Sequence, residues 1–136
     1  MDKAYYEQLW QEFETSPFWV FMTIKIESLE EGSVKLVMPP SENYVNLNGG
    51  VHGGVLTSLL DSVMGLTVRS TWDVPAVTQS LTVQFLRAPK PDEALFASGS
   101  VVKAGRTVAS IEGRLFGADG RQLALGIGTF MKVPGA

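Results

Sequence analysis

The sequence of 136 residues has no cysteine, a single histidine and no long hydrophobic run. Without cysteine the chain can form no disulfide, thiolate metal site or cysteine nucleophile. The one histidine, His52, argues against a metal site built from several histidines. The uncharged apolar runs fall short of the ~20 residues that a membrane-spanning helix needs. The N-terminal residues lack the basic start and apolar run of a signal peptide, so we expect a cytoplasmic protein.

Charged residues are also sparse, at 18% of the chain, and hydrophobic residues make up 45%. This composition is typical of a globular protein. Residues 1–68 carry three basic and nine acidic side chains, a net charge of -6, whereas residues 69–136 carry eight and five, a net charge of +3. An anionic ligand would therefore meet the second half, although two halves of a small domain also differ by chance. No dense basic run with interleaved aromatic residues occurs, so we expect no nucleic-acid partner.

The pattern of apolar residues predicts a single α+β domain over residues 1–136. Helical spacing predicts a helix at 2–14, within an N-terminal segment 1–16, followed by an apolar cluster at 18–21. A long, apolar central helix is predicted at about 53–70. Alternating residues and turn signals predict strands at 23–27, 33–38, 77–85, 94–103, 107–116 and 122–133. Strands joined mostly by hairpins form an antiparallel sheet, and the central helix lies on one face of it.

Asp61 is the most unusual residue of the central helix. From Val55 to Val68 the sequence holds no other charged residue, and a helix that is apolar on nearly all sides is a buried helix. Burying an unpaired carboxylate costs free energy, so its presence needs a reason. We favour a chemical reason; the structural alternative is an aspartate that caps or bridges at an interface.

The residues before this aspartate form a motif that runs Asn46…Gly49…His52-Gly53-Gly54…Asp61. The motif resembles the signature of hotdog-fold acyl-CoA thioesterases, and among these the phenylacetate-degradation (PaaI-like) branch. Supporting positions lie further along the chain, at Thr78, 83–89, Gly105-Arg106 and 129–133. The likeness runs from about residue 17 to residue 133. Ala88-Pro89 departs from the Pro-Ala of many members, which we expect to change a loop and not the chemistry.

The resemblance implies a long helix wrapped by a curved antiparallel sheet of about five to six strands. It further implies a homodimer or homotetramer in which two sheets join and the active sites lie at the dimer interface. The implied reaction is hydrolysis of an acyl-CoA to the free acid and coenzyme A, with no metal or cofactor and no membrane partner.

The resemblance also assigns roles within the motif. Asp61 corresponds to the catalytic carboxylate, which either attacks the thioester carbonyl or takes a proton from water; the sequence leaves both open. Gly53 and Gly54 open the helix and let a substrate approach the backbone, and the Gly53 N–H corresponds to the oxyanion donor. A tight loop-to-helix entry is the structural alternative for both glycines. Asn46 corresponds to a polar residue that faces the thioester or the water, or else it forms an Asx-type turn.

The remaining candidate residues are less specific. His52 is expected to hydrogen-bond to backbone and fix the loop, with direct proton transfer as the alternative. Thr78 corresponds to a hydroxyl that holds the water in some relatives, and is otherwise an ordinary strand threonine. Arg87, Lys90 and Arg106 are candidates for the coenzyme A phosphates, because arginine binds phosphate through two hydrogen bonds and lysine through its charge. The alternative for each is a solvated surface charge.

The spacing of Gly53 and Asp61 bears on assembly. Eight residues of helix span roughly 12 Å, and the aspartate side chain recovers part of that distance by leaning toward the N-terminus. One thioester carbon must lie about 3 Å from both groups. We therefore expect Asp61 of one subunit to act on the carbonyl that Gly53 of another subunit holds.

Three other functions fit parts of the sequence. A hotdog protein that binds acyl-CoA without hydrolysing it would keep the glycines but has no need of Asp61. An enoyl-CoA hydratase calls for an acid–base pair that includes a histidine placed differently from His52. A structural or regulatory domain is the weakest alternative, because the sequence shows no DNA-binding extension.

Overall fold

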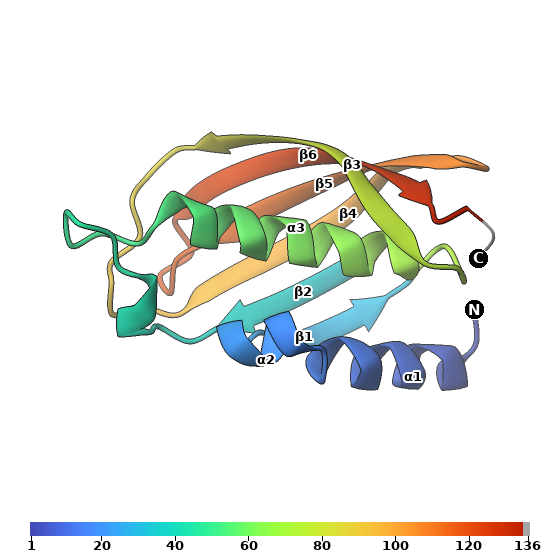
Figure 1. Cartoon of the computed structure of the whole chain (residues 1–136), viewed down its shortest axis with the longest axis horizontal. Helices are drawn as coiled ribbons and strands as arrows, with labels where there is room; N and C mark the ends of the chain where they lie inside the picture. The colour runs from blue at the N-terminus through green and yellow to red at the C-terminus, as the bar shows by residue number, and fades with distance from the viewer. Residues whose placement is uncertain (135–136) are drawn as a thin grey trace.

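Six antiparallel strands form one sheet, and a long helix lies across one face of it (Figure 1). The computed structural model describes residues 1–134. The helices are α1 (Lys3–Glu14), α2 (Pro17–Met22) and α3 (Gly53–Arg69), with a 3₁₀ turn at Glu42–Tyr44. The strands are β1 (Lys25–Glu30), β2 (Ser33–Met38), β3 (Ala76–Phe85), β4 (Leu95–Ala104), β5 (Val108–Phe116) and β6 (Gln122–Lys132).

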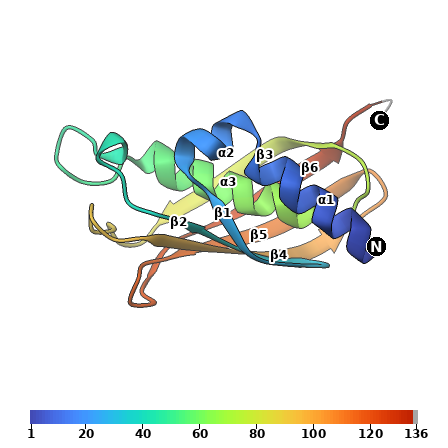
Figure 2. The ribbon, with the colours of Figure 1, turned by 90° about the horizontal axis from the view of Figure 1, so that it is seen from below.

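The strand order in the sheet is β1-β2-β4-β5-β6-β3, so β3 reaches one edge and β1 the other. The predicted α+β class is confirmed, with a central helix on a six-stranded antiparallel sheet. Helices α1 and α2 lie on the same side of the sheet as α3 (Figure 2). The core sits between α3 and the sheet, where Leu59, Leu60, Val63 and Met64 are fully buried. None of the helices within residues 1–134 is both long and apolar enough to cross a bilayer.

The N-terminal region differs from the sequence prediction in one respect. The apolar cluster at 18–21 belongs to a separate helix, α2, because Pro17 starts a helical turn after the N-cap Ser16. Thr23 then adopts a left-handed conformation (φ 60°) that ends α2, which delays the first strand from the predicted residue 23 to Lys25. Trp19 is buried, whereas Phe21 is 69% exposed.

A row of glycines crosses the sheet beneath α3. Gly99 of β4 lies opposite Gly113 of β5, which in turn lies opposite Gly126 of β6. A Cβ atom on Gly99 would meet the Thr67 hydroxyl oxygen at 2.2 Å, and one on Gly113 would meet Met64 at 3.0 Å. Because these positions lack side chains, α3 can lie close to the sheet. The glycine row thereby sets the distance between the sheet and α3, the helix that carries Asp61.

Gly99→Ala tests this close approach. We expect the free energy of unfolding to fall by about 1–3 kcal/mol, because the new methyl group forces α3 or Thr67 to move. Ser98→Ala, whose side chain points to the other face of β4, is the matched control and should change stability little. Urea denaturation of both variants measures the difference, and equal stability would contradict the packing argument.

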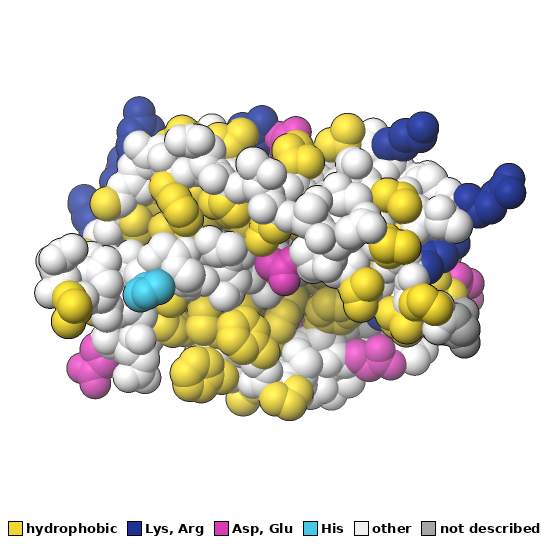
Figure 3. Space-filling model, turned by 45° about the horizontal axis from the view of Figure 1, so that its top comes forward, with side chains coloured by type: hydrophobic (Ala, Val, Ile, Leu, Met, Phe, Trp, Pro, Cys, Tyr) yellow, Lys and Arg dark blue, Asp and Glu magenta, His cyan; other side chains and the backbone are white. Residues whose placement is uncertain are grey.

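The two edges of the sheet differ in charge and length. The ten residues of β3 include no charged residue, no proline and no glycine, whereas the six of β1 include Lys25, Glu27 and Glu30. Long, uncharged edge strands offer unpaired backbone groups to another strand, and charged residues discourage such pairing. The face around β3 shows hydrophobic side chains among uncharged ones, with most Lys and Arg toward its upper and right-hand margins (Figure 3).

Candidate active site

Asp61 lies midway along α3 and pairs with a hydroxyl from β3. The Thr78 hydroxyl donates a hydrogen bond to Asp61 Oδ1 across 2.7 Å. Both residues line a cleft of about 310 Å³ whose walls come from α1, α2, α3 and the start of β3. Most of α3 is buried, but the Asp61 side chain itself is half-buried and reaches this cleft. A carboxylate beside a cleft can meet a substrate, which a fully buried one cannot.

The N-terminus of α3 presents a free backbone donor. His52 is the N-cap residue, and its Nδ1 accepts a hydrogen bond from the Gly54 N–H across 2.8 Å. The Gly54 N–H therefore already has an acceptor. His52 makes the hydrogen bond to backbone that the sequence predicted for it. In the described part of the chain no acceptor takes the Gly53 N–H. A free N–H at a helix N-terminus favours negative charge.

A cavity of about 330 Å³ lies beside Gly53 and is lined in part by Asn46, Phe85 and Arg87. Asn46 Oδ1 accepts hydrogen bonds from the Asn48 N–H (2.9 Å) and the Gly50 N–H (3.1 Å), so the residue forms an Asx-type turn. The side-chain nitrogen, Nδ2, is the group that remains to donate a hydrogen bond to a ligand. The loop turn and a ligand contact are therefore compatible roles for Asn46.

Within one chain the two groups of residues lie apart. The cleft of Asp61 and Thr78 shares no lining residue with the cavity of Gly53 and Asn46. Gly53 and Asp61 are eight positions apart on one continuous helix, or roughly 12 Å along its axis. The structure therefore brings the candidate catalytic residues together in two groups and not in one site: Asp61 with Thr78, and Gly53 with Asn46 and His52.

The predicted basic residues also separate into two places. Arg87 lines the cavity beside Gly53, and Lys90 follows three residues later in the same loop. Arg106 follows the far end of β4, a strand of ten residues or about 33 Å from that loop. Arg87 and Lys90 can contact one ligand at the Gly53 cavity, but Arg106 of the same chain cannot.

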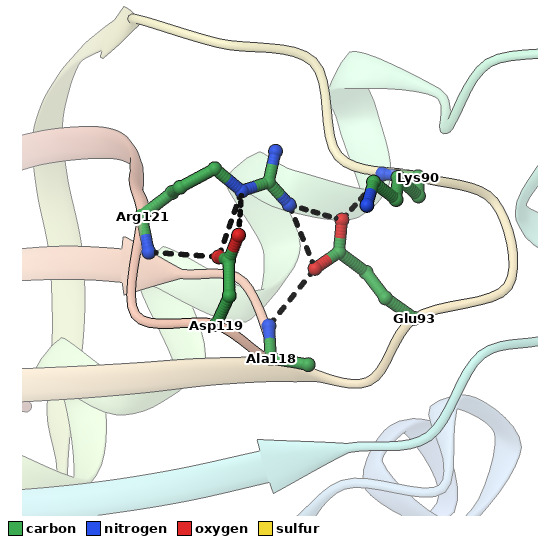
Figure 4. A network of polar contacts seen from close by, with 5 residues as sticks. All are labelled: Lys90, Glu93, Ala118, Asp119 and Arg121. Carbon is green, nitrogen blue, oxygen red and sulfur yellow. Dashed lines mark hydrogen bonds and ion pairs between the residues drawn. The ribbon is translucent and has the colours of Figure 1, made fainter.

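An ion-pair network holds the loop that carries these two basic residues (Figure 4). Glu93 accepts two hydrogen bonds from Arg121 (2.7 and 2.9 Å), one from the Lys90 N–H (2.6 Å) and one from the Ala118 N–H (2.9 Å). Arg121 also contacts Asp119 at 2.7 Å. The Glu93 side chain is 8% exposed. The sequence analysis missed this network, since Glu93 and Arg121 are 28 positions apart with no short-range pattern between them.

The network predicts sensitivity to acid. Burial alone raises the pKa of Glu93, but hydrogen bonds from the Lys90 N–H, Arg121 and the Ala118 N–H outweigh it and hold the pKa below its ordinary value. A carboxyl whose pKa is lowered by folding stabilises the folded state above its unfolded pKa, and this stabilisation is lost as pH falls through the folded pKa. We expect Glu93→Gln to lower the free energy of unfolding at neutral pH by about 1–3 kcal/mol, and to flatten its decline below pH ~4.5.

Chemical denaturation of wild type and Glu93→Gln at several pH values measures both effects. Glu112→Gln is the matched control, because Glu112 pairs with Arg114 in a more exposed ion pair, which contributes little to stability. If Glu93→Gln were as stable as wild type at neutral pH, the network would not hold the loop.

Comparison with known proteins identifies the family. The family model described as "Thioesterase superfamily" matches residues 48–124, more than half of the chain. The chain belongs to the thioesterase superfamily. A protein of Saccharolobus solfataricus named "Putative esterase" is 32% identical to this thioesterase-superfamily chain over 111 residues, covering 81% of this chain and 79% of that protein.

Solved structures of other proteins share the fold. A thioesterase-family protein of Streptococcus pneumoniae, crystallised with coenzyme A, is 27% identical, with a TM-score of 0.83 over 90% of this chain and 95% of that one. The E. coli PaaI protein, from the phenylacetic acid degradation operon, is 24% identical, with a TM-score of 0.87 over 96% of each chain. The hotdog fold that the sequence motif implied is thus confirmed for this member of the superfamily.

Proposed function

We propose that this chain hydrolyses acyl-CoA thioesters, with Asp61 of one subunit and the Gly53 N–H of another acting on the same carbonyl. The observation that carries the proposal is the Asp61–Thr78 pair in an open cleft, on the helix whose Gly53 N–H has no acceptor within residues 1–134. Membership of the thioesterase superfamily supports the reaction type. Coenzyme A bound to the S. pneumoniae relative supports the class of substrate.

Asp61 provides either the general base or the nucleophile of the reaction. Its carboxylate either takes a proton from a water molecule that attacks the thioester carbon or attacks that carbon itself. The Thr78 hydroxyl donates to Oδ1 and so orients the carboxylate, which leaves Oδ2 to meet the water or the carbonyl. In the first route the carbon–sulfur bond then breaks, and the proton that Asp61 took from water passes to the leaving thiolate. In the second route the bond breaks to leave an acyl-aspartyl anhydride, which water hydrolyses to the free acid, and a proton from that water passes to the thiolate.

The Gly53 N–H stabilises the negative charge that develops on the carbonyl oxygen. When the thioester carbonyl is attacked, its oxygen gains negative charge, and a preorganised N–H donor stabilises that charge. The Gly53 N–H has this property, because it is free and lies at the positive end of the α3 dipole. His52 contributes by holding the adjacent Gly54 N–H, which fixes the first turn. Arg87 and Lys90, on the loop beside this cavity, are placed to meet the coenzyme A phosphates.

Pairing of the edge strand β3 between two subunits would bring Asp61 of one close to Gly53 of the other. Thr78 lies near the beginning of β3 and Phe85 at its end, where the Phe85 ring lies beside Gly53. If β3 pairs antiparallel with β3 of a second subunit, the Thr78 end of each strand lies opposite the Phe85 end of the other. Asp61 of one subunit then approaches Gly53 of the partner subunit. The uncharged edge of β3 supports this pairing.

Release of free thiol from a panel of acyl-CoAs tests the proposed function. We expect turnover of at least one class of acyl group by the wild-type protein. Tight binding of an acyl-CoA without thiol release would instead favour the non-catalytic binding protein. The hydratase alternative has less support, because His52 Nδ1 is occupied by the Gly54 N–H.

A further inference from the structure

The cleft at Asp61 continues along α3 toward a second charged residue. Asp61, Gly65 and Arg69 recur every four positions, so they share one face of the helix, and all three line the cleft. A Cβ atom on Gly65 would meet nothing within 4 Å, so the middle of this face is open space. The facing walls are apolar and include Phe13 and Phe18. The cleft is thus an apolar passage with a carboxylate at one end and a guanidinium at the other.

Arg69 has little to satisfy its charge. Arg114 and Arg121 each pair with a carboxylate, but Arg69 forms no ion pair within residues 1–134. Its guanidinium donates a long hydrogen bond from Nη2 to the Tyr5 hydroxyl (3.4 Å), and its buried Nε has no acceptor among the described residues. A half-buried cation without an anion is costly, and its position in the last turn of α3 offsets only part of that cost. The guanidinium therefore has free donors beside the cleft.

We propose that this passage is the acyl chamber and that Arg69 selects acyl groups with a carboxylate at the end remote from the thioester. The inference rests on the proposed function, since it places the thioester carbon at Asp61. A volume of about 310 Å³ is at the small end of ligand sites, so it suits one aromatic ring or a medium-length chain. Charge-assisted hydrogen bonds from the guanidinium would hold the remote carboxylate. The backbone positions of Asp61 and Arg69 are eight residues apart on α3, or roughly 12 Å. The arginine side chain shortens the gap, because helical side chains lean toward the N-terminus and hence toward Asp61.

Matched pairs of substrates test the chamber. We would measure kcat and KM for hexanoyl-CoA against adipoyl-CoA, and for benzoyl-CoA against 4-carboxybenzoyl-CoA. The wild type should favour the carboxylated member of at least one pair by about 10- to 100-fold in kcat/KM. Arg69→Met should lose this preference, so that the ratio of kcat/KM between the two members of a pair falls to about one. Arg69→Lys, which keeps the charge but not the planar fork, should retain part of it.

The outcomes separate the inference from the proposed function. Hydrolysis of the uncharged substrates with no preference for the carboxylated ones would overturn the role of Arg69 and leave the thioesterase proposal intact. A preference that survives in Arg69→Met would also overturn it. Failure to hydrolyse any acyl-CoA would refute the proposed function, and the chamber with it. The absence of a preference in the wild type decides against the inference without any variant. If Arg69→Met folds poorly, Arg69→Gln is the second uncharged variant, and a preference that survives in it overturns the role of Arg69.

Discussion

Asp61→Asn is expected to lower kcat for thiol release by about 10²- to 10⁴-fold while the protein remains folded and keeps the oligomeric state of the wild type. The amide keeps the size of the side chain and can still accept the hydrogen bond from Thr78, but it is neither a base nor a nucleophile. The loss should therefore fall on kcat and not on KM, because the acyl-CoA contacts remain. Steady-state kinetics with the best substrate of the panel, together with thermal denaturation, make the measurement.

Two further variants give this result its meaning. Thr78→Val removes the hydroxyl that orients Asp61 and should cost only about tenfold, since Asp61 keeps its charge. Ser98→Ala, on β4 and outside the lining of both the cleft and the Gly53 cavity, should leave kcat near wild type. If Asp61→Asn retained wild-type activity, Asp61 would be a structural aspartate and the proposed mechanism would be wrong.

Turnover in water labelled with oxygen-18 tests the nucleophilic role of Asp61. A nucleophilic attack forms an acyl-aspartyl anhydride, and water that opens this anhydride at the aspartyl carbon leaves a solvent oxygen in Asp61. A general base never exchanges its own oxygens. Label in the Asp61 peptide, measured by mass spectrometry, would show the nucleophile. Label confined to the product acid under multiple turnovers would exclude an anhydride opened at the aspartyl carbon and would fit either the general base or an anhydride opened at the acyl carbon.

Local patterns in the sequence predicted most of the architecture, because strand alternation and turn residues act over short distances. The charged residue within an apolar helix pointed to Asp61, and its hydrogen bond from Thr78 joins two positions that the sequence analysis had singled out. The spacing of Asp61 and Arg69 is also visible in the sequence, as two charged residues eight positions apart on one helix, but that spacing alone predicts no site. Periodicity identifies which residues share a face, but not whether that face borders a cleft.

Features that depend on long-range packing could not be predicted in this way. The ion pair of Glu93 and Arg121 joins two loops, and neither residue has a neighbour in sequence that indicates its partner. The glycines at 99, 113 and 126 come from three strands, and their alignment depends on strand register. Register depends on the whole sheet, so a row across several strands becomes visible only once every pairing is known.

Mixed dimers provide the sharpest test of a shared active site, and Gly53→Pro supplies the second defect that this test needs. Gly53 is the first residue of α3, a position where proline is well tolerated, so this change removes the N–H and disturbs the helix little. We expect a loss of about 10²- to 10³-fold in kcat, as for removal of an oxyanion donor. Gly53→Ala keeps the N–H and places its Cβ 3.5 Å from Phe85, an ordinary contact, so it should fold like wild type and retain more activity than Gly53→Pro.

A dimer purified through two different tags, with Gly53→Pro in one chain and Asp61→Asn in the other, should regain about half of the wild-type activity. One of its two sites then combines an intact Gly53 N–H with an intact Asp61 from the other chain, as two-fold symmetry requires. A dimer of wild type with the double variant Gly53→Pro/Asp61→Asn is the reciprocal case and should be nearly inactive, because each site then carries one defect. If each chain instead formed its own site, the first dimer would be inactive and the second would keep half of its activity. The opposite signs of the two results decide whether catalysis needs the dimer, whatever the stability of each variant.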